Sequence, residues 1–466
     1  MSVPALPEQN PMTSSPSAPR PALSSYRWII CGLLLFSTTF NYLDRQVISY
    51  LKVYYCTPVA QGGFGWSNTD FANLTSFFTA FYAGMTIVAG WVIDKIGTKL
   101  GLALSIIVWS VCGILNAFVG RLVAMHILVR SAFGIGEGGN FPASIKTVAE
   151  WFPKRERALA TGIFNSGSNV GAMVAALFVP WCLVHWGNEK GWKMAFILTG
   201  AVGFIWLIFW FWLYETPANQ KRLSKAEFDY IHSDVDEAHA PDGAVDRAKI
   251  PWSKLLGYRQ TWAFFFGKFM TDGIWWFYLF WLPDYLSKQF GMTTAQVRLP
   301  TFIVYGVSIV GSVYGGSIPM TFINKGMPVY KARMRAMLLI AVFPLVVLST
   351  QFFGNVSRFG ANAAILAVAT ICIAAAAHQA WSANLFTTVS DMFPKKAVGT
   401  VTGIGAMAGG VGGVVVQKLA GGLTDAFIKT PQKAYLIMFV ICASSYLIAW
   451  VIIKALVPRH RTITDL

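Results

Sequence analysis

The chain has 466 residues, of which 55% are hydrophobic and 12% are charged, and its formal net charge is +16. A soluble domain carries about 25% charged residues, so this composition excludes a soluble protein and indicates a surface that mostly faces lipid. The bases are scattered between apolar runs and form no basic face, so no nucleic-acid partner is expected.

The first 25 residues are rich in Pro, Ser and Ala and lack the basic-then-apolar order of a signal peptide. We expect a disordered cytoplasmic tail over 1–25. Apolar runs long enough to cross a bilayer follow, and lipid allows them only helical structure. Twelve spans are predicted, at about 27–55, 67–93, 100–120, 122–150, 157–185, 192–214, 260–289, 295–322, 333–353, 359–391, 398–427 and 432–456.

One long polar stretch, 215–258, separates the sixth span from the seventh. It predicts a cytoplasmic linker in which Ser224 caps a short surface helix. Bases cluster after every second span, at 95–99, 154–157, 221–225, 325–335, 395–396 and 459–461. This asymmetry places both termini in the cytoplasm, with a second tail at 457–466, and predicts a multi-pass protein of the cytoplasmic (inner) membrane.

The two halves of the chain repeat one sequence pattern. Glu150-Trp151-Phe152-Pro153 precedes the fifth span, and Asp391-Met392-Phe393-Pro394 precedes the eleventh. The offset is constant, since 393 − 152 = 241 and 412 − 171 = 241. An even number of spans per half makes the repeats parallel, with binding at mid-membrane between them. We therefore predict an all-α membrane protein with six-helix bundles at 26–214 and 259–456, which is the major-facilitator arrangement.

The loop after the second span carries a spaced motif. It runs Gly90-Trp91-Val92-Ile93-Asp94-Lys95-Ile96-Gly97-Thr98-Lys99 and matches the major-facilitator loop signature. Gly90 and Gly97 permit close packing, and Asp94 is expected to pair with a base or a helix N-terminus, with Lys95 and Lys99 beside it. Such a cluster would latch one face of the protein. The alternative is a plain topology anchor. The equivalent loop of the second half, 316–335, keeps the bases but lacks the Asp.

Six charged side chains lie inside apolar runs, where a charge at the bilayer centre costs several kcal/mol. They must line a wet cavity or pair with one another. Both signs together suggest a site that binds an anion through cations and moves a proton on a carboxylate. The six are Asp44, Arg45, Arg130, Glu137, Lys268 and Asp272.

The sequence around these charges resembles the anion:cation symporter family of the major facilitators, and within it the bacterial hexuronate transporters. The resemblance runs from Tyr26 to about Lys454. It is carried by Asn41-Tyr42-Leu43-Asp44-Arg45, the segment 130–138 from Arg130 to Gly138, Glu150-Trp151-Phe152-Pro153 and Ala377-His378-Gln379-Ala380. It implies symport of a hexuronate with protons, by a monomer in contact with membrane lipids.

Arg45 is the predicted carboxylate-binding residue, because a guanidinium matches a carboxylate bidentately and keeps its charge. The resemblance implies the same role, with Tyr42 as a hydroxyl donor. The alternative is a lock between Arg45 and an acid, with no ligand.

Asp44 and Glu137 are the proton-carrier candidates. Burial favours a neutral carboxyl and a nearby cation favours a charged one, so a substrate that takes the cation would drive proton uptake. The family relation assigns proton coupling to both acids. Permanent ion pairs are the alternative. Arg130 lies two turns from Glu137, on the same face, and is expected to pair with Glu137 or Asp44 and to join the substrate site.

The second half adds further candidates. Lys268 is a possible second contact for a carboxylate or hydroxyl, or the i,i+4 partner of Asp272. His378 takes the place of Glu137, since 378 − 241 = 137, and should face the same cavity unless it is a core residue. Trp381 is a candidate for stacking on a sugar ring. Polyol contacts are predicted at Tyr82, Asn165, Gln379 and Asn384.

The predicted function is proton-coupled symport of a sugar acid by alternating access. Alternatives are symport of an aldonate, glucarate or aromatic carboxylate, or a non-transporting receptor on the same scaffold. An enzyme is not expected, because no catalytic triad, nucleotide loop or metal-ligand spacing occurs. No cofactor is expected, and the six cysteines are expected as free buried thiols.

Overall fold

The computed structural model describes residues 25–233, 252–459 and 463, and every regular element in this part of the chain is helical. The predicted tail before Ser25, the middle of the predicted linker and most of the tail at 457–466 lie outside the described residues. Ser224 caps a short linker helix as predicted, because its Oγ accepts a hydrogen bond from the Glu227 backbone N–H at 3.2 Å.

The first half contains six helices besides the short η1 (Val59–Gln61). They are α1 (Tyr26–Cys56), α2 (Asn68–Ile96), α3 (Thr98–Leu115), α4 (Val123–Glu137), α5 (Asn140–Trp151) and α6 (Lys154–Leu213). A short turn at Gly138 and Gly139 separates α4 from α5, and the two together form one span. The 60-residue α6 contains two spans, which meet at Gly187, where φ is 69° and only glycine is unstrained.

The linker region contributes η2 (Pro217–Asn219), α7 (Lys225–Ile231) and α8 (Trp252–Leu256). The second half follows with α9 (Arg259–Phe290), α10 (Arg298–Ile323), α11 (Val329–Val342), η3 (Phe343–Ser349), α12 (Thr350–Phe353), α13 (Val356–Phe359), α14 (Asn362–Met392), α15 (Lys395–Ala426) and α16 (Pro431–Leu456). The segment α11–η3–α12 makes one span, so each half has six spans within the described residues.

Hydropathy alone finds fewer spans. Eight helices in the described part of the chain are long and apolar enough to cross a membrane, and one of them, Leu159–Leu213, is α6 with its two spans. The spans that fail this criterion are α1, α4–α5 and α9. These carry all six charges that the sequence singles out, so the least hydrophobic spans are the ones with candidate site residues.

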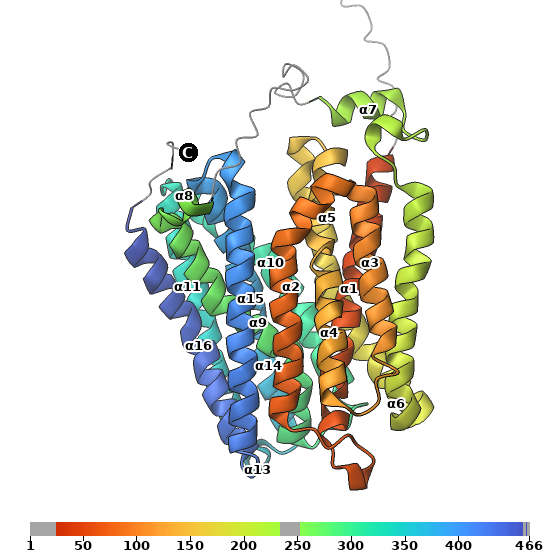
Figure 1. Cartoon of the computed structure of the whole chain (residues 1–466). Helices are drawn as coiled ribbons and strands as arrows, with labels where there is room; N and C mark the ends of the chain where they lie inside the picture. The colour runs from red at the N-terminus through yellow and green to blue at the C-terminus, as the bar shows by residue number, and fades with distance from the viewer. Residues whose placement is uncertain (1–24, 234–251, 460–462, 464–466) are drawn as a thin grey trace, which may run out of the picture.

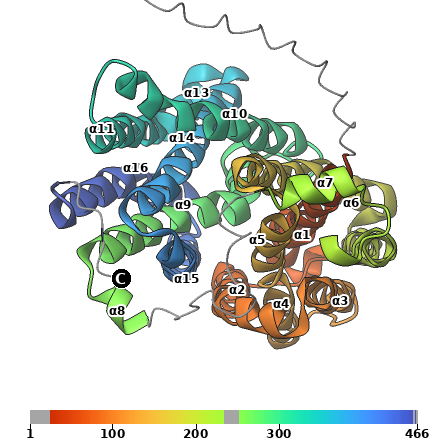
Figure 2. The same cartoon turned by 90° about the horizontal axis from the view of Figure 1, so that it is seen from above.

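The two halves stand side by side as separate groups, α1–α6 and α9–α16 (Figure 2). The start of α1, the end of α16, α7 and α8 share one face, which we call the linker face; the other is the opposite face (Figure 1). The repeat is visible in the backbone. Helices α6 and α15 begin directly after Pro153 and Pro394, whose φ/ψ angles are −62°/152° and −63°/150°.

Small residues let the halves touch along two seams. In the first, α15 crosses α2 so closely that a Cβ on Gly410 would lie 2.3 Å from Ala83 Cβ, and one on Gly421 would lie 2.3 Å from Ala72 Cβ. In the second, Ser308 Oγ of α10 donates to Asn169 Oδ1 of α6 at 3.1 Å. Because 410 − 241 = 169, Gly410 and Asn169 occupy equivalent places in the repeat.

These seam contacts run from mid-helix toward the opposite face. Nearer the linker face, a Cβ on Gly90 of α2 or Gly403 of α15 would meet nothing within 4 Å, and the same holds for Gly162 of α6 and Gly316 of α10. The described contacts between the halves are thus concentrated between the middle of the helices and the opposite face.

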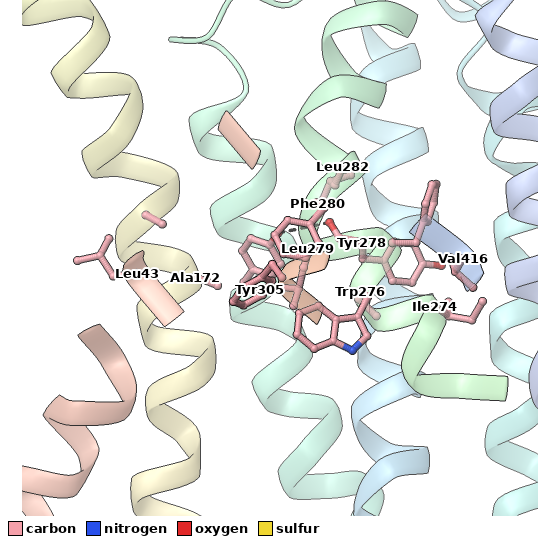
Figure 3. Close-up of a cluster of buried hydrophobic side chains, with 14 of the residues drawn as sticks. Leu43, Ala172, Ile274, Trp276, Tyr278, Leu279, Phe280, Leu282, Tyr305 and Val416 are labelled. Atoms are coloured by element: carbon pink, nitrogen blue, oxygen red, sulfur yellow. Dashed lines mark hydrogen bonds between the residues drawn. The ribbon is translucent and has the colours of Figure 1, made fainter. Parts of the chain in front are cut away.

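An aromatic stretch of α9 fills the middle of the molecule. Trp276, Tyr278 and Phe280 are buried and lie between Tyr305 of α10 and Val416 of α15 (Figure 3). Trp276 stacks on Phe280 at a centroid distance of 5.7 Å. Both rings also contact Phe78 of α2 edge-on. Helix α9 is therefore packed against the first half at the level of the candidate site.

Candidate functional site

The centre of the candidate site is an ion pair between two helices of the first half. Arg45 Nε, on α1, donates to Glu137 Oε2, on the last turn of α4, at 2.8 Å, and each residue is 1% exposed. Gly134 lets α4 pack closely on α2, because a Cβ there would lie 2.6 Å from the Phe78 carbonyl oxygen. Burying both charges is expensive unless they pair, so each charge depends on the other.

Aromatic rings enclose the Arg45 guanidinium. Its carbon lies 4.3 Å from the ring centroid of Tyr42, 4.5 Å from Tyr82 and 5.1 Å from Trp276. Such contacts stabilise a desolvated cation by about 2 kcal/mol. Since Trp276 belongs to α9, the second half contributes to the surroundings of Arg45, and Arg45 lies where the halves meet.

Asp44 lies next to Arg45 in sequence but does not share its partners. It is 2% exposed, and neither carboxylate oxygen accepts a hydrogen bond from a described residue. Oε1 of Glu137 also lacks a partner within the described chain. Buried polar atoms are nearly always bonded, so these oxygens, which lie on two buried acids at the Arg45 site, are candidates to bind a proton or a ligand.

In the conformation described here, the direct contact of Arg130 is neither of the expected acids, Glu137 and Asp44. Arg130 Nη2 donates instead to the backbone carbonyl of Arg45 at 3.2 Å, while Nε and Nη1 have no partner among the described residues. The guanidinium packs on the Phe133 ring at 4.4 Å. Arg130 thus fixes the α1 backbone at Arg45 and retains two free donors.

In the second half, Lys268 and Asp272 form the alternative ion pair along α9, with Nζ and Oδ2 2.6 Å apart. Lys268 also lies 4.4 Å from the Phe386 ring centroid of α14. His378 hydrogen-bonds through Nδ1 to the Tyr446 hydroxyl at 2.9 Å and stacks on Trp275 at 5.0 Å. These residues therefore contact partners within their own half.

The remaining substrate candidates do not converge on Arg45, with the exception of Tyr42 and Tyr82. Asn384 Nδ2 donates to the carbonyls of Gly315 and Ala380, both at 2.8 Å, and so ties α14 to α10. Trp381 is fully buried and packs edge-on against Tyr446. Gln379 is half-buried and Asn165 is exposed.

The loop at 90–99 makes contacts within the first half. Asp94 pairs with Lys146 of α5 at 2.9 Å, and Lys99 pairs with Glu215. Lys95 lies over the Trp91 ring, and Gly97 joins α2 to α3 with φ at 84°. Gly90 has open space where a Cβ would lie. Asp94 thus pairs with a base, as the motif predicts, and the contacts of this loop described above do not involve the second half.

The sequence analysis missed a second buried ion pair. Lys52 Nζ of α1 lies 2.7 Å from Asp284 Oδ2 of α9, and the two residues are 0% and 1% exposed. The sequence could have indicated this pair, because both residues are charges within apolar spans, and the same criterion identified Arg45. Trp276 was also missed, since one more aromatic among 15% carries no signal of its own.

Two repeat-related bundles, with buried charges of both signs near their interface, define a membrane transporter rather than an enzyme. A solved bacterial homologue of the human lysosomal transporter Spinster has the same fold, with a TM-score of 0.73 at 16% identity over 96% of this chain and all of that one. The family model of the Major Facilitator Superfamily matches residues 34–417. The chain belongs to that superfamily.

Curated relatives cover most of the chain. It is 29% identical to a hexuronate transporter of Escherichia coli (strain K12) over 434 residues, which are 93% of this chain and 95% of that protein. It is 31% identical to a galacturonate transporter of Dickeya chrysanthemi over 304 residues, or 64% of this chain and 83% of that protein.

Proposed function

We propose that the protein imports a sugar acid anion of the hexuronate class together with protons, by alternating access across the cytoplasmic membrane, with both termini in the cytoplasm. The observation that carries this proposal is the buried Arg45–Glu137 pair at 2.8 Å beside the orphaned carboxylate of Asp44. Two cations, Arg45 and Arg130, and two acids share this site, and an entering carboxylate would compete with Glu137 for Arg45.

The exchange of partners supplies the coupling. A substrate carboxylate that binds the Arg45 guanidinium displaces Glu137, since both compete for the same donors. Glu137 then lies buried without a cation, and such a carboxylate is far less costly when protonated. Asp44 is also buried, and its oxygens accept no hydrogen bond from the described residues. Anion and proton therefore enter together, and the loaded site carries less net charge than either alone would leave.

The relatives support the substrate class, since those with the names given above carry hexuronate and galacturonate. The structure favours an anion with one carboxylate over an aldarate with two. Lys268, the candidate cation of the second half, is held by Asp272 at 2.6 Å, and Arg130 is bonded to the Arg45 carbonyl at 3.2 Å. Arg45 is therefore the cation best placed for a carboxylate. Symport of an aldonate, with one carboxylate and the same hydroxyls, is the second candidate.

Uptake into proteoliposomes tests the proposal. Labelled glucuronate, galacturonate, galactonate, glucarate and neutral glucose would each be offered with and without an imposed pH gradient. We expect accumulation of one or more monocarboxylate sugar acids only with the gradient, and no uptake of glucose. Uptake that ignores the gradient would contradict proton coupling. Binding with no uptake of any compound would indicate a receptor.

A further inference from the structure

A second buried network joins the halves nearer the opposite face. Lys52 Nζ contacts Asp284 Oδ2 of α9 at 2.7 Å and donates to Asn68 Oδ1 of α2 at 2.8 Å. The Tyr435 hydroxyl of α16 donates to the same carboxylate. Lys52 and Asp284 belong to different halves, so this pair must break if the halves separate here.

The position of Lys52 relates it to the central site. It follows Arg45 by seven residues, so it lies on the same face of α1, about 10 Å further toward the opposite face. Asp284 likewise follows Trp276, which contacts Arg45, by two turns of α9. Both helices therefore present a charge between the Arg45 site and the opposite face. An anion that entered from this face would meet Lys52 first.

The pair is asymmetric when each half is considered alone. Asp284 has a second cation one turn along its own helix, Lys288, at 3.8 Å. Within its own half, the described polar partner of Lys52 is the neutral amide of Asn68. Separation of the halves therefore leaves Asp284 with a cation but leaves Lys52 without an anion. A lysine in this state attracts a carboxylate from solution.

A neighbouring contact breaks in the same movement. Asp425 of α15 accepts hydrogen bonds from the Thr69 backbone N–H at 2.7 Å and from Asn68 Nδ2 at 2.8 Å. Asn68 therefore touches both Lys52 and the second half. Opening at this face releases Asn68 together with Lys52, and the amide and the ammonium become available side by side for a carboxylate and a hydroxyl.

We propose that Lys52 is a second carboxylate-binding residue, which holds the incoming anion while the opposite face is open and passes it to Arg45. Asp284 takes the place of that carboxylate when the face is closed. The ligand is the sugar acid of the proposed function, on which this inference rests. Lys52 and Arg45 then act in sequence on one carboxylate, so a single negative group suffices for both.

The test is sided transport kinetics with matched variants. Uptake by right-side-out and inverted vesicles gives the KM at the opposite face and at the linker face. For Lys52→Met we expect the KM to rise about tenfold at the opposite face only, as for the loss of one charged hydrogen bond. Asp284→Asn removes the competitor and should leave that KM within about twofold of wild type.

Lys418→Met is the control. Lys418 also bridges the halves, to Asn73 of α2, but in an exposed position, so its loss should change neither KM by more than about twofold. Equal KM increases for Lys52→Met and Asp284→Asn would show a merely structural lock and overturn the proposal, as would an unchanged KM for Lys52→Met.

The double variant Lys52→Met/Asp284→Asn distinguishes a folding defect of Lys52→Met from the loss of a binding residue, because it leaves no buried charge unpaired. We expect it to show the same increase in KM at the opposite face only. Wild-type uptake in the same vesicles reports on the proposed function, and the ratio of variant to wild-type KM reports on Lys52. Wild-type vesicles that transport no sugar acid would overturn both.

Discussion

The two halves bury charge at mid-membrane in different ways. In the first half, the pair joins different helices, and its members lie 92 residues apart in sequence. Around it, Asp44, one oxygen of Glu137 and two nitrogens of Arg130 are left without partners in the described chain. In the second half, Lys268 and Asp272 pair within one turn of α9, and His378 is bonded to Tyr446.

This difference separates groups that are available from groups that are engaged. An i,i+4 pair survives any rigid movement of its helix, whereas a pair between helices can exchange partners when a ligand arrives. Buried polar atoms without partners are costly, and a chain retains them where another species completes them. Under the proposed function, we therefore expect the anion and the proton to bind mainly in the first half, with a smaller, positioning contribution from the second.

The largest expected effect is at Arg45. Arg45→Lys keeps the charge but loses the planar fork and the contact to Glu137, so kcat/KM for uptake should fall about 100-fold or more. Arg27→Lys is the matched control, since Arg27 is a buried arginine of the same helix that pairs with Glu227 of the linker helix α7 at 2.8 Å. The lysine keeps a cation beside Glu227 and away from the Arg45 site, so that variant should transport within about threefold of wild type. Equal losses in both would contradict the special role of Arg45.

Glu137→Gln should separate exchange from accumulation. The amide still fills the space beside Arg45 but carries no proton, so substrate exchange continues while uphill uptake stops. For one proton per monoanion, a gradient of one pH unit supports an accumulation ratio of about tenfold, which the variant should reduce to unity. The ratio is measured with labelled substrate at steady state.

Glu150→Gln is the control for that experiment. Glu150 accepts hydrogen bonds from Thr98 at 2.7 Å and Tyr214 at 2.8 Å, away from the central pair. The Glu150→Gln protein should accumulate substrate as the wild-type protein does. A Glu137→Gln protein that still concentrated substrate would remove Glu137 from the proton pathway and leave Asp44 as the remaining candidate.

A variant at Lys268 tests the second half of this comparison. If Lys268 serves only Asp272, Lys268→Met should raise the KM because Asp272 loses its partner. The double variant Lys268→Met/Asp272→Asn should then return the KM to the wild-type value. If Lys268 also contacts substrate, the KM should stay raised about fivefold in both, the effect of an ion pair in a hydrated site. We expect the first result, measured as the KM for uptake, because Asp272 already engages Lys268. A KM that stays raised in both variants would contradict this. Full recovery in the double variant would confine Lys268 to its structural pair.

The sequence predicted the architecture well because each clue was local. Apolar runs located the spans, the constant offset of 241 located the repeat, and Pro153 and Pro394 begin α6 and α15 at equivalent positions. Charges inside apolar runs also led to Arg45 and Glu137. Periodicity cannot show which cation meets which acid across helices, because that depends on how closely α4 approaches α1 and α2.

The contacts that the sequence did not predict share one origin. Helical spacing places Arg130 and Glu137 on one face, but Arg130 bonds to the Arg45 carbonyl and leaves Glu137 to Arg45 itself. Asn384 has the composition of a polyol contact, yet its amide joins α14 to α10. Lys52 and Asp284 are recognised as a pair only when the fold places α1 beside α9. In each case the partner comes from another helix.

The smallest expected effect is at His378, where the repeat and the structure give different expectations. The repeat predicts a group that faces the cavity, while the structure engages Nδ1 with Tyr446 and one ring face with Trp275. Nε2 is then the atom left for a substrate hydroxyl.

Two substitutions test this. His378→Gln places an amide near Nε2, and His378→Asn places one near Nδ1. If Nε2 contacts substrate, Asn should raise the KM about threefold, as expected for one neutral hydrogen bond, and Gln should not. The reverse order would make His378 a core residue of the second half and confine substrate recognition in that half to α9.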